Sequence, residues 1–251
     1  MNLDQEIRYS RNITLKEISI EGQKKLLNSS VLVVGAGGLG SPLILYLAAI
    51  GVGKIGIIDD DKVDLSNLQR QIIHETNDIG CLKTESASES VYDLNPNIEI
   101  ELYNKRLDKD NISGIISQYD VVADGSDNFE TRFLINDTCY KERKTLVSAA
   151  ISGFVGQLYT FKAFTNNELP CYRCLYADIP PAGTAPKCSE SGVLGSVAGI
   201  MGSWQATEII KELLGIGESL AGHFIIFDAL NSESRKIKII PDPKCKCCGG
   251  D

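Results

Sequence analysis

Glycines in the run GAGGLGS have the spacing of a phosphate-binding loop. Gly35, Gly37 and Gly40 form G-x-G-x-x-G between the apolar run VLVV and a helical pattern. Glycine lets backbone N–H groups approach phosphate oxygens, and the start of a helix adds a favourable dipole. Asp59 follows the next apolar run, where a carboxylate can bind ribose hydroxyls. These features predict a nucleotide site, although the glycines could also serve only tight packing.

The polar run after Asp59 favours a triphosphate over the diphosphate bridge of a dinucleotide. It contains Asp61, then Asp64-Leu-Ser-Asn67-Leu-Gln-Arg70-Gln71, and it is followed by Lys83 at the start of a helical pattern. Two cations and two amides suit the charge and the oxygens of three phosphates. Arg70 or Lys83 alone would be interpreted as a surface charge. Their shared position after Asp59 favours binding.

Asp127 follows the apolar segment DVVAD, so it is expected at the carboxyl edge of a sheet, where doubly wound folds bind ligands. A carboxylate there can hold Mg²⁺ against phosphates. The alternative is an N-cap for the helix expected from Phe129, and the two roles can coexist.

The cysteines form two groups with metal-ligand spacing. Cys171-Tyr-Arg-Cys174 is one C-x-x-C pair, and Cys245-Lys-Cys247-Cys248 supplies the second. Two such pairs predict a structural tetrahedral Zn²⁺ site. The fourth ligand is Cys247 or Cys248, and C-x-x-C spacing favours Cys248. A redox C-x-x-C is the alternative, disfavoured because the motif does not lie at a strand-to-helix turn.

The remaining nucleophiles and bases are few. Cys188 lies in a long Pro- and Gly-containing loop beside Lys187, which favours thiolate and makes Cys188 a candidate nucleophile. Cys81 and Cys139 are expected to be packing residues. With His74 and His223 as the only histidines, a histidine general acid or base is a poor prospect.

Composition limits the partners and the compartment. The 251 residues carry a net charge of -8, which argues against a nucleic acid or an anionic membrane as the main partner. No apolar run approaches the roughly 18 residues of a spanning helix, and the N-terminus lacks the core of a signal peptide. We expect a soluble, cytoplasmic protein whose eight cysteines stay reduced.

Strand and helix patterns alternate along the first 151 residues. Strands are expected at 31–34, 55–59, 98–103, 120–124 and 145–151, with helices at 39–50, 83–94, before Tyr119 and at 129–141. Later strands near 156–161, 224–230 and 236–240 have short connections that suit antiparallel pairing. A long helix through Trp204 should end near Gly215. The predicted fold is α/β: a doubly wound, Rossmann-like, mainly parallel sheet extended by antiparallel strands, with a structural zinc site.

Taken in order, these motifs resemble the MoeB/ThiF/HesA family, bacterial relatives of the ubiquitin-activating enzymes. The likeness runs from Arg8-Tyr-Ser-Arg11 through GAGGLGS, DDDKVDLSNLQRQ, the lysine of GCLKTES, DGSDN, CYRC and KCSESGV to the terminal cysteines. It implies a single adenylating domain over 1–251, with an N-terminal helical arm (about 1–28), a nucleotide-binding half (about 29–150) and a carrier-binding and zinc half (about 151–251).

The resemblance also implies roles for these residues. ATP would contact Gly38 and the neighbouring glycines, Asp59 would bind ribose, and phosphates would be held by Asn67, Arg70, Gln71 and Lys83. Asp127 would bind Mg²⁺, and Arg11 would reach the partner subunit's phosphates, which implies a homodimer. The expected reaction is adenylation of the C-terminal Gly-Gly carboxylate of a small ubiquitin-like sulfur-carrier protein, whose tail would pass near Cys188.

Sulfur would then come from a separate donor, such as a cysteine desulfurase or a rhodanese, because the chain ends soon after the last cysteines without an appended rhodanese domain. The carboxylate is already ionised at neutral pH, so adenylation needs no general base. The identity of the carrier, of the molybdopterin, thiamin or cysteine-biosynthetic type, stays open, as does a covalent role for Cys188.

Two other functions fit part of the pattern. An NAD-dependent oxidoreductase fits the glycines and Asp59 but not the run SNLQRQ. A non-catalytic module that only docks a carrier is disfavoured because every polar residue expected at the site is present.

Overall fold

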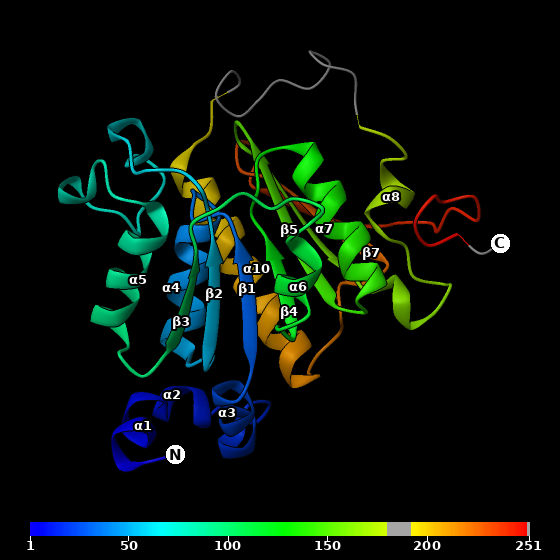
Figure 1. The fold of residues 1–251 in the computed structure, drawn as a ribbon. Coiled ribbons are helices and arrows are strands. Elements are labelled where there is room, and N and C mark those ends of the chain that lie inside the picture. The colour runs from blue at the N-terminus through cyan, green and yellow to red at the C-terminus, as the bar shows by residue number, and fades with distance from the viewer. Residues whose placement is uncertain (180–191, 250–251) are drawn as a thin grey trace.

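A computed structural model describes residues 1–179 and 192–249 of the chain. It begins with the short helices α1 (Leu3–Arg8), α2 (Ser10–Ile13) and α3 (Ser19–Leu27). Figure 1 shows these three helices together at one end of the molecule, below the sheet. They correspond to the helical arm expected at about 1–28.

The centre of the molecule is an 8-stranded sheet with the order β3-β2-β1-β4-β5-β6-β7-β8. The strands β1 (Ser30–Val34), β2 (Lys54–Ile58), β3 (Glu99–Tyr103), β4 (Val121–Asp124) and β5 (Thr145–Ser152) pair in parallel. The strands β6 (Val155–Phe161), β7 (His223–Asp228) and β8 (Glu233–Lys238) extend the sheet in antiparallel fashion. The predicted mixed sheet is confirmed.

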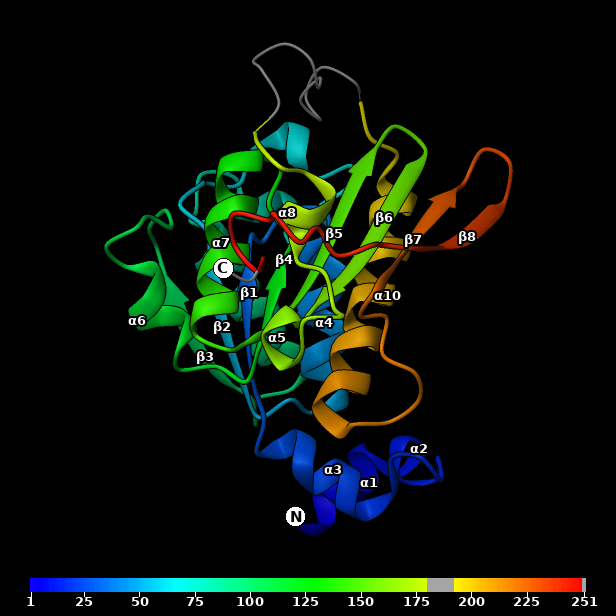
Figure 2. The same cartoon turned by 90° about the vertical axis from the view of Figure 1, so that its right-hand side faces the viewer.

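Helices cover both faces of the parallel part. One core contains Val31 and Val33 of β1 and the inner sides of α4 (Gly40–Ile50), α5 (Lys83–Leu94) and α10 (Gly195–Leu214). The other core contains Leu32 and Val34 and the inner sides of α6 (Ile112–Ile116) and α7 (Phe129–Lys141). Successive side chains of a strand point to opposite faces, so a continuous apolar run such as SVLVV contributes side chains to both cores. Figures 1 and 2 show this layered arrangement from two directions.

Short elements complete the described chain. They are the 3₁₀ helices η1 (Leu65–Asn67), η2 (Thr76–Asp78) and η3 (Ala163–Thr165), and the helix α8 (Tyr172–Leu175). In Figure 2 the segment after β8 runs back across the molecule to α8, which brings the C-terminal cysteines to the C-x-x-C helix. Among the described residues, no helix is long and apolar enough to cross a membrane.

Most element boundaries agree with the sequence pattern, and the larger differences are at the last two strands. The strand expected at 224–230 is β7, which ends at Asp228. The helices at 83–94 and 129–141 and the end of α10 before Gly215 are as predicted. The last strand was expected at 236–240, but β8 begins at Glu233 and ends at Lys238. Its start is set by pairing with β7, where Glu233 lies opposite Asp228. The apolar run KIKII carried no information about this register.

The order of the strands reverses between β1 and β4, since β2 and β3 lie on one side of β1 and β4 and β5 on the other. Ligands of open α/β sheets bind outside the carboxyl ends of the strands at such a point. The loop after β1 and the loop after β4 meet here: a Cβ on Gly35 would lie 3.3 Å from the Gly125 carbonyl oxygen.

Candidate functional site

A cavity of about 700 Å³ opens at this switch point. Its volume is within the range of small-ligand sites. The predicted site residues that line it are Gly35, Gly37, Gly38, Asp59, Asp61, Asn67, Arg70, Gln71, Lys83 and Asp127. Two predicted residues, Gly40 and Arg11, do not belong to the lining.

Gly40 shapes the glycine loop from behind. It is the first residue of α4, and a Cβ on it would collide with the carbonyl oxygen of Gly35, whose φ is +94°. Only glycine permits this approach. No side chain caps the N-terminus of α4. Ser41 N already donates to Gly37 O at 2.9 Å and Pro42 has no N–H, so the backbone donors left for a ligand belong to the glycine loop before Ser41.

Asp59 stabilises the same loop through hydrogen bonds. Its Oδ2 accepts a hydrogen bond from Ala36 N at 2.8 Å, and its Oδ1 accepts one from Asp61 N at 2.9 Å. An ionised carboxylate has about four acceptor positions, so both oxygens can still accept from a ligand hydroxyl. The carboxylate therefore both organises the loop and can accept from a ribose.

Lys83 presents a positive charge to the cavity. It starts α5, its side chain is only 7% exposed, and its Nζ lies 2.7 Å from Oδ2 of Asp61, which is 67% exposed. A buried ammonium needs a negative partner, and Asp61 supplies one on the solvent side. A phosphate oxygen entering the cavity can share that ammonium.

Gln71 is buried beside the glycine loop with an unused polar atom. The residue is 3% exposed, and its Oε1 has no hydrogen-bond partner among the described residues. A Cβ on Gly37 would lie 3.7 Å from its Nε2, so the amide faces the loop. Buried polar groups are normally satisfied, so this orphan acceptor fits a site that is completed by a ligand.

Arg70 lies over the glycine loop from the other side, because a Cβ on Gly38 would lie 3.4 Å from its Cγ. Its Nη1 donates to Ser66 O at 3.1 Å, and its position follows η1, where the Asp64 and Asn67 side chains form a capping box. Neither contact neutralises the guanidinium. The charge stays available to an anion in the cavity.

Asp127 is exposed, lines the cavity and is not the N-cap of α7. The N-cap of α7 is Asn128, whose side chain accepts from Thr131 N at 2.9 Å. The sequence left open a capping role for Asp127, and the structure gives that role to its neighbour.

A buried network beneath the cavity was not anticipated. Asp124 is 1% exposed, and its two carboxylate oxygens accept from Ser126 N at 2.9 Å and from Ser148 Oγ at 2.7 Å. Arg132, also in the cavity lining, donates from Nη2 to the carbonyls of Ser126 and Ala149 at 2.6 and 3.1 Å. Burial is the largest effect and lowers the pKa of Arg132, but the Asp124 carboxylate together with Tyr172 and Tyr159 raises that pKa above its usual value. This network fixes the loop that carries Asp127.

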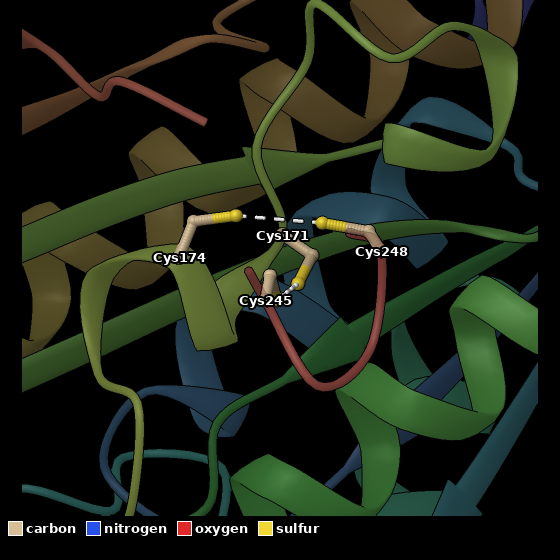
Figure 3. A group of neighbouring side chains, drawn as sticks. All are labelled: Cys171, Cys174, Cys245 and Cys248. Atoms are coloured by element: carbon tan, nitrogen blue, oxygen red, sulfur yellow. Dashed lines mark hydrogen bonds between the residues drawn. The ribbon is translucent and has the colours of Figure 1, made fainter. Parts of the chain in front are cut away.

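The four predicted zinc ligands lie together, as Figure 3 shows. The Sγ atoms of Cys171, Cys174, Cys245 and Cys248 all lie within 4.8 Å of one another. Two of the separations are 3.6 Å (Cys171 to Cys245) and 3.4 Å (Cys174 to Cys248). Tetrahedral Zn–S bonds of about 2.3 Å place ligand sulfurs about 3.8 Å apart, so the cluster fits Zn²⁺.

Cys247 lies beside this group with different contacts. Its Sγ accepts from Asn136 Nδ2 at 3.7 Å, and its N–H donates to Cys245 Sγ at 3.5 Å. Hydrogen bonds from Cys247 and Cys248 lower the pKa of the Cys171 thiol. This direction favours the thiolate form, which metal binding requires.

Two predicted site residues, Arg11 and Cys188, are not found at the cavity. Arg11 is exposed on α2, in the helical group that Figure 1 shows below the sheet. Cys188 lies outside the described residues.

Comparison with known proteins found relatives over almost the whole chain. The model of the ThiF family matches residues 9–248. The SAMP-activating enzyme E1 of Haloferax volcanii is 47% identical, with 96% of this chain and 88% of that protein covered. The sulfur carrier protein adenylyltransferase of Thermus thermophilus is 44% identical over 97% of this chain and 91% of its own.

A maize relative, adenylyltransferase and sulfurtransferase MOCS3-1, is 46% identical, and here the chain spans about half of the relative's length, 52%. Among solved structures, E. coli MccB has the same fold, with a TM-score of 0.84 at 22% identity over 98% of this chain and 73% of that one.

Proposed function

The chain belongs to the ThiF family, and from this premise we propose that it adenylates the C-terminal Gly-Gly carboxylate of a small ubiquitin-like sulfur-carrier protein with ATP. The observation that carries the proposal is the cavity, which joins a glycine loop at a helix N-terminus, the ribose-type carboxylate of Asp59, the cations of Arg70 and Lys83, and the exposed carboxylate of Asp127. This set serves a nucleoside triphosphate better than the diphosphate bridge of NAD.

ATP would lie with its ribose at Asp59 and its phosphates along the glycine loop. The backbone N–H groups of the glycine loop before Ser41, the guanidinium of Arg70 and the ammonium of Lys83 would face the phosphate oxygens. Asn67 and Gln71 line the same side of the cavity, and their side-chain N–H groups can donate to phosphate oxygens.

In the reaction, a carrier carboxylate oxygen attacks the α-phosphorus, the bond from that phosphorus to the bridging oxygen breaks, and pyrophosphate leaves with the electron pair. An acyl-adenylate remains. The chain's contribution is to align the two anions and to stabilise the negative charge that moves onto the leaving oxygen, which is the task of Arg70 and Lys83. A Mg²⁺ ion at Asp127, when bound, would offset charge on the phosphates.

Zinc is proposed as a structural ion at Cys171, Cys174, Cys245 and Cys248. The support is the geometry of the four sulfurs and their origin in two segments far apart in the sequence. An ion there would tie the C-terminal segment to α8 and close a long loop, which stabilises the folded chain.

The proposal includes a homodimer. Arg11 does not line the cavity of its own subunit, and an exposed cation on the distant helical arm can serve the cavity of a second copy. Mixing Arg11→Ala with Asp127→Asn tests this, because heterodimers would contain one intact site and regain activity that each variant lacks. No recovery after verified subunit exchange would exclude action in trans.

The whole of 1–251 is proposed as one adenylating domain, with the carrier bound by the half from about 151. A separate cysteine desulfurase or rhodanese would then supply sulfur to the acyl-adenylate, in the reducing cytoplasm, where thiols persist. The carrier would belong to molybdopterin, thiamin or related sulfur-transfer biosynthesis.

Calorimetry with ATP and with NAD separates this function from the oxidoreductase alternative. ATP should bind and NAD should not. Carrier-dependent exchange of label between pyrophosphate and ATP separates it from simple docking, because a docking module forms no adenylate.

A further inference from the structure

His74 is buried directly behind the glycine loop and makes hydrogen bonds with both ring nitrogens. Nε2 lies 2.9 Å from the carbonyl oxygen of Ala36, and Nδ1 lies 2.7 Å from Oγ of Ser86. The Ser86 hydroxyl lies 2.6 Å from Oδ2 of Asp78. Since Ala36 N also donates to Asp59, the Ala36 segment of the loop is held between Asp59 and His74.

The number of protons in this chain of groups depends on the charge of His74. A carbonyl only accepts, so Nε2 must carry a hydrogen. In a neutral ring, Nδ1 would then need the hydroxyl proton of Ser86, and the Asp78 carboxylate needs the same proton. A single hydroxyl cannot donate to both. A second proton on the ring removes the conflict, because Nδ1 then donates to Ser86 and Ser86 donates to Asp78.

Asp78 is the acceptor at the end of this chain. Burial raises its pKa, but hydrogen bonds from Ser86 Oγ and Glu75 N together hold the pKa below its usual value. The carboxylate is therefore ionised at neutral pH, so a proton that completes the chain of hydrogen bonds has to go to His74.

The groups around His74 shift its pKa in opposite directions. Burial has the largest effect and lowers the pKa of His74, the Ala36 carbonyl raises it, the Lys83 ammonium lowers it, and the Asp78 and Asp59 carboxylates raise it. The net pKa lies below 6.5, so the ring is neutral at pH 7 in the free protein. Lys83 is the cation that ATP phosphates would neutralise, and its repulsion of a proton on His74 would then weaken.

We infer that His74 is a positioning residue that takes up a proton when ATP binds, so that the completed chain from Ala36 through His74 and Ser86 to Asp78 fixes the glycine loop around the phosphates. The inference rests on the proposed function, because it needs phosphates at Lys83. His74 touches no reacting atom and acts only through the loop.

The test is an NMR titration of the imidazole in the His223→Gln protein, in which His74 is the only histidine. Without ligand, the ring should be the neutral Nε2–H tautomer at pH 7. With a non-hydrolysable ATP analogue and Mg²⁺, its pKa should rise by about one unit or more, which corresponds to proton uptake on binding. An unchanged or lowered pKa in the bound protein would overturn the inference, and so would an Nδ1–H tautomer in the free protein.

Linkage gives an independent readout. The bound state holds more protons than the free state, so the Kd for the analogue should fall as pH falls between the two pKa values, by up to about tenfold per pH unit. His74→Gln keeps a side-chain donor but cannot titrate, and it should show only the residual pH dependence of the analogue itself. If His74 merely filled space, His74→Gln would weaken binding equally at every pH.

Ser86→Ala is the companion variant, since it keeps His74 and removes the acceptor for Nδ1. Proton uptake should shrink there although the ring is intact. The calorimetry that measures binding also separates the two claims: analogue bound with no rise in the His74 pKa overturns only this inference, whereas no binding at all overturns the proposed function with it.

Discussion

The ammonium of Lys83 lies 2.7 Å from Oδ2 of Asp61, with the lysine side chain buried and the carboxylate largely exposed. The pair places a positive charge at the inner wall of the nucleotide cavity and keeps it neutralised from the solvent side. It is built from the first residue of α5 and from the loop that follows β2.

Replacing Lys83 by Met should lower carrier-dependent exchange by about 100-fold, because a preorganised charge on the phosphates is lost. Asp61→Asn should cost less, because the ammonium stays in place and loses only its partner. Lys54→Met is the matched control: Lys54 pairs with Glu101 at 2.6 Å at the other end of β2. It should leave exchange unchanged, and an equal loss in both lysine variants would contradict the assignment.

Variants of the neighbouring residues Asp127 and Asn128 should differ in effect, the first on catalysis and the second on stability. Asp127→Asn should reduce exchange by about 100-fold with no change in melting temperature, because its carboxylate is exposed and proposed for Mg²⁺. Asn128→Ala should destabilise the protein by about 1 kcal/mol through loss of the α7 cap. Thermal unfolding and pyrophosphate exchange, measured on both variants, test this division of roles. A destabilised but active Asp127→Asn would show that the carboxylate serves the fold.

The metal content of two neighbouring cysteine variants identifies the fourth ligand. Cys248→Ser should lose Zn²⁺ and melt earlier, because its sulfur belongs to the group of four. Cys247→Ser should keep about one Zn²⁺ per chain, since its Sγ faces Asn136. Atomic absorption on protein purified without chelator provides the measurement. Metal retained in Cys248→Ser and lost in Cys247→Ser would reverse the ligand assignment.

Cys188→Ala should retain exchange within about tenfold, a barrier change near 1.4 kcal/mol, because the carrier carboxylate is the nucleophile and no thiol takes part in adenylation. If the thiol matters, thiocarboxylate formation with a sulfur donor should fall while exchange persists. Both assays on one folded, zinc-loaded preparation test the separation, and loss of exchange itself would refute it.

Much of the fold was predictable because its signals are local. Apolar runs of strand length alternate with helical patterns, and G-x-G-x-x-G fixes the position of the first loop. The cavity residues from Asp59 to Lys83 were predictable for the same reason, since one polar run after one strand carries most of them.

Contacts between distant segments were not predictable. His74 carried no pattern that marked Ser86 and Asp78 as its partners. Arg132 looked like an ordinary polar residue of α7, although it is partly buried and donates to carbonyls of the loop after β4 and of β5. The start of β8 depends on pairing with β7. Each of these features is fixed by tertiary geometry, which a single sequence does not display.

The central claim is tested most directly by ATP–pyrophosphate exchange with a Gly-Gly carrier protein. Purified enzyme, Mg²⁺, ATP, labelled pyrophosphate and a carrier should give exchange that depends on the carrier. It should disappear when the carrier lacks its last two glycines and when Arg70 is replaced by Ala, with folding and zinc content unchanged. Carrier-independent exchange, or none with any of the host's small Gly-Gly proteins while ATP binds normally, would contradict the account.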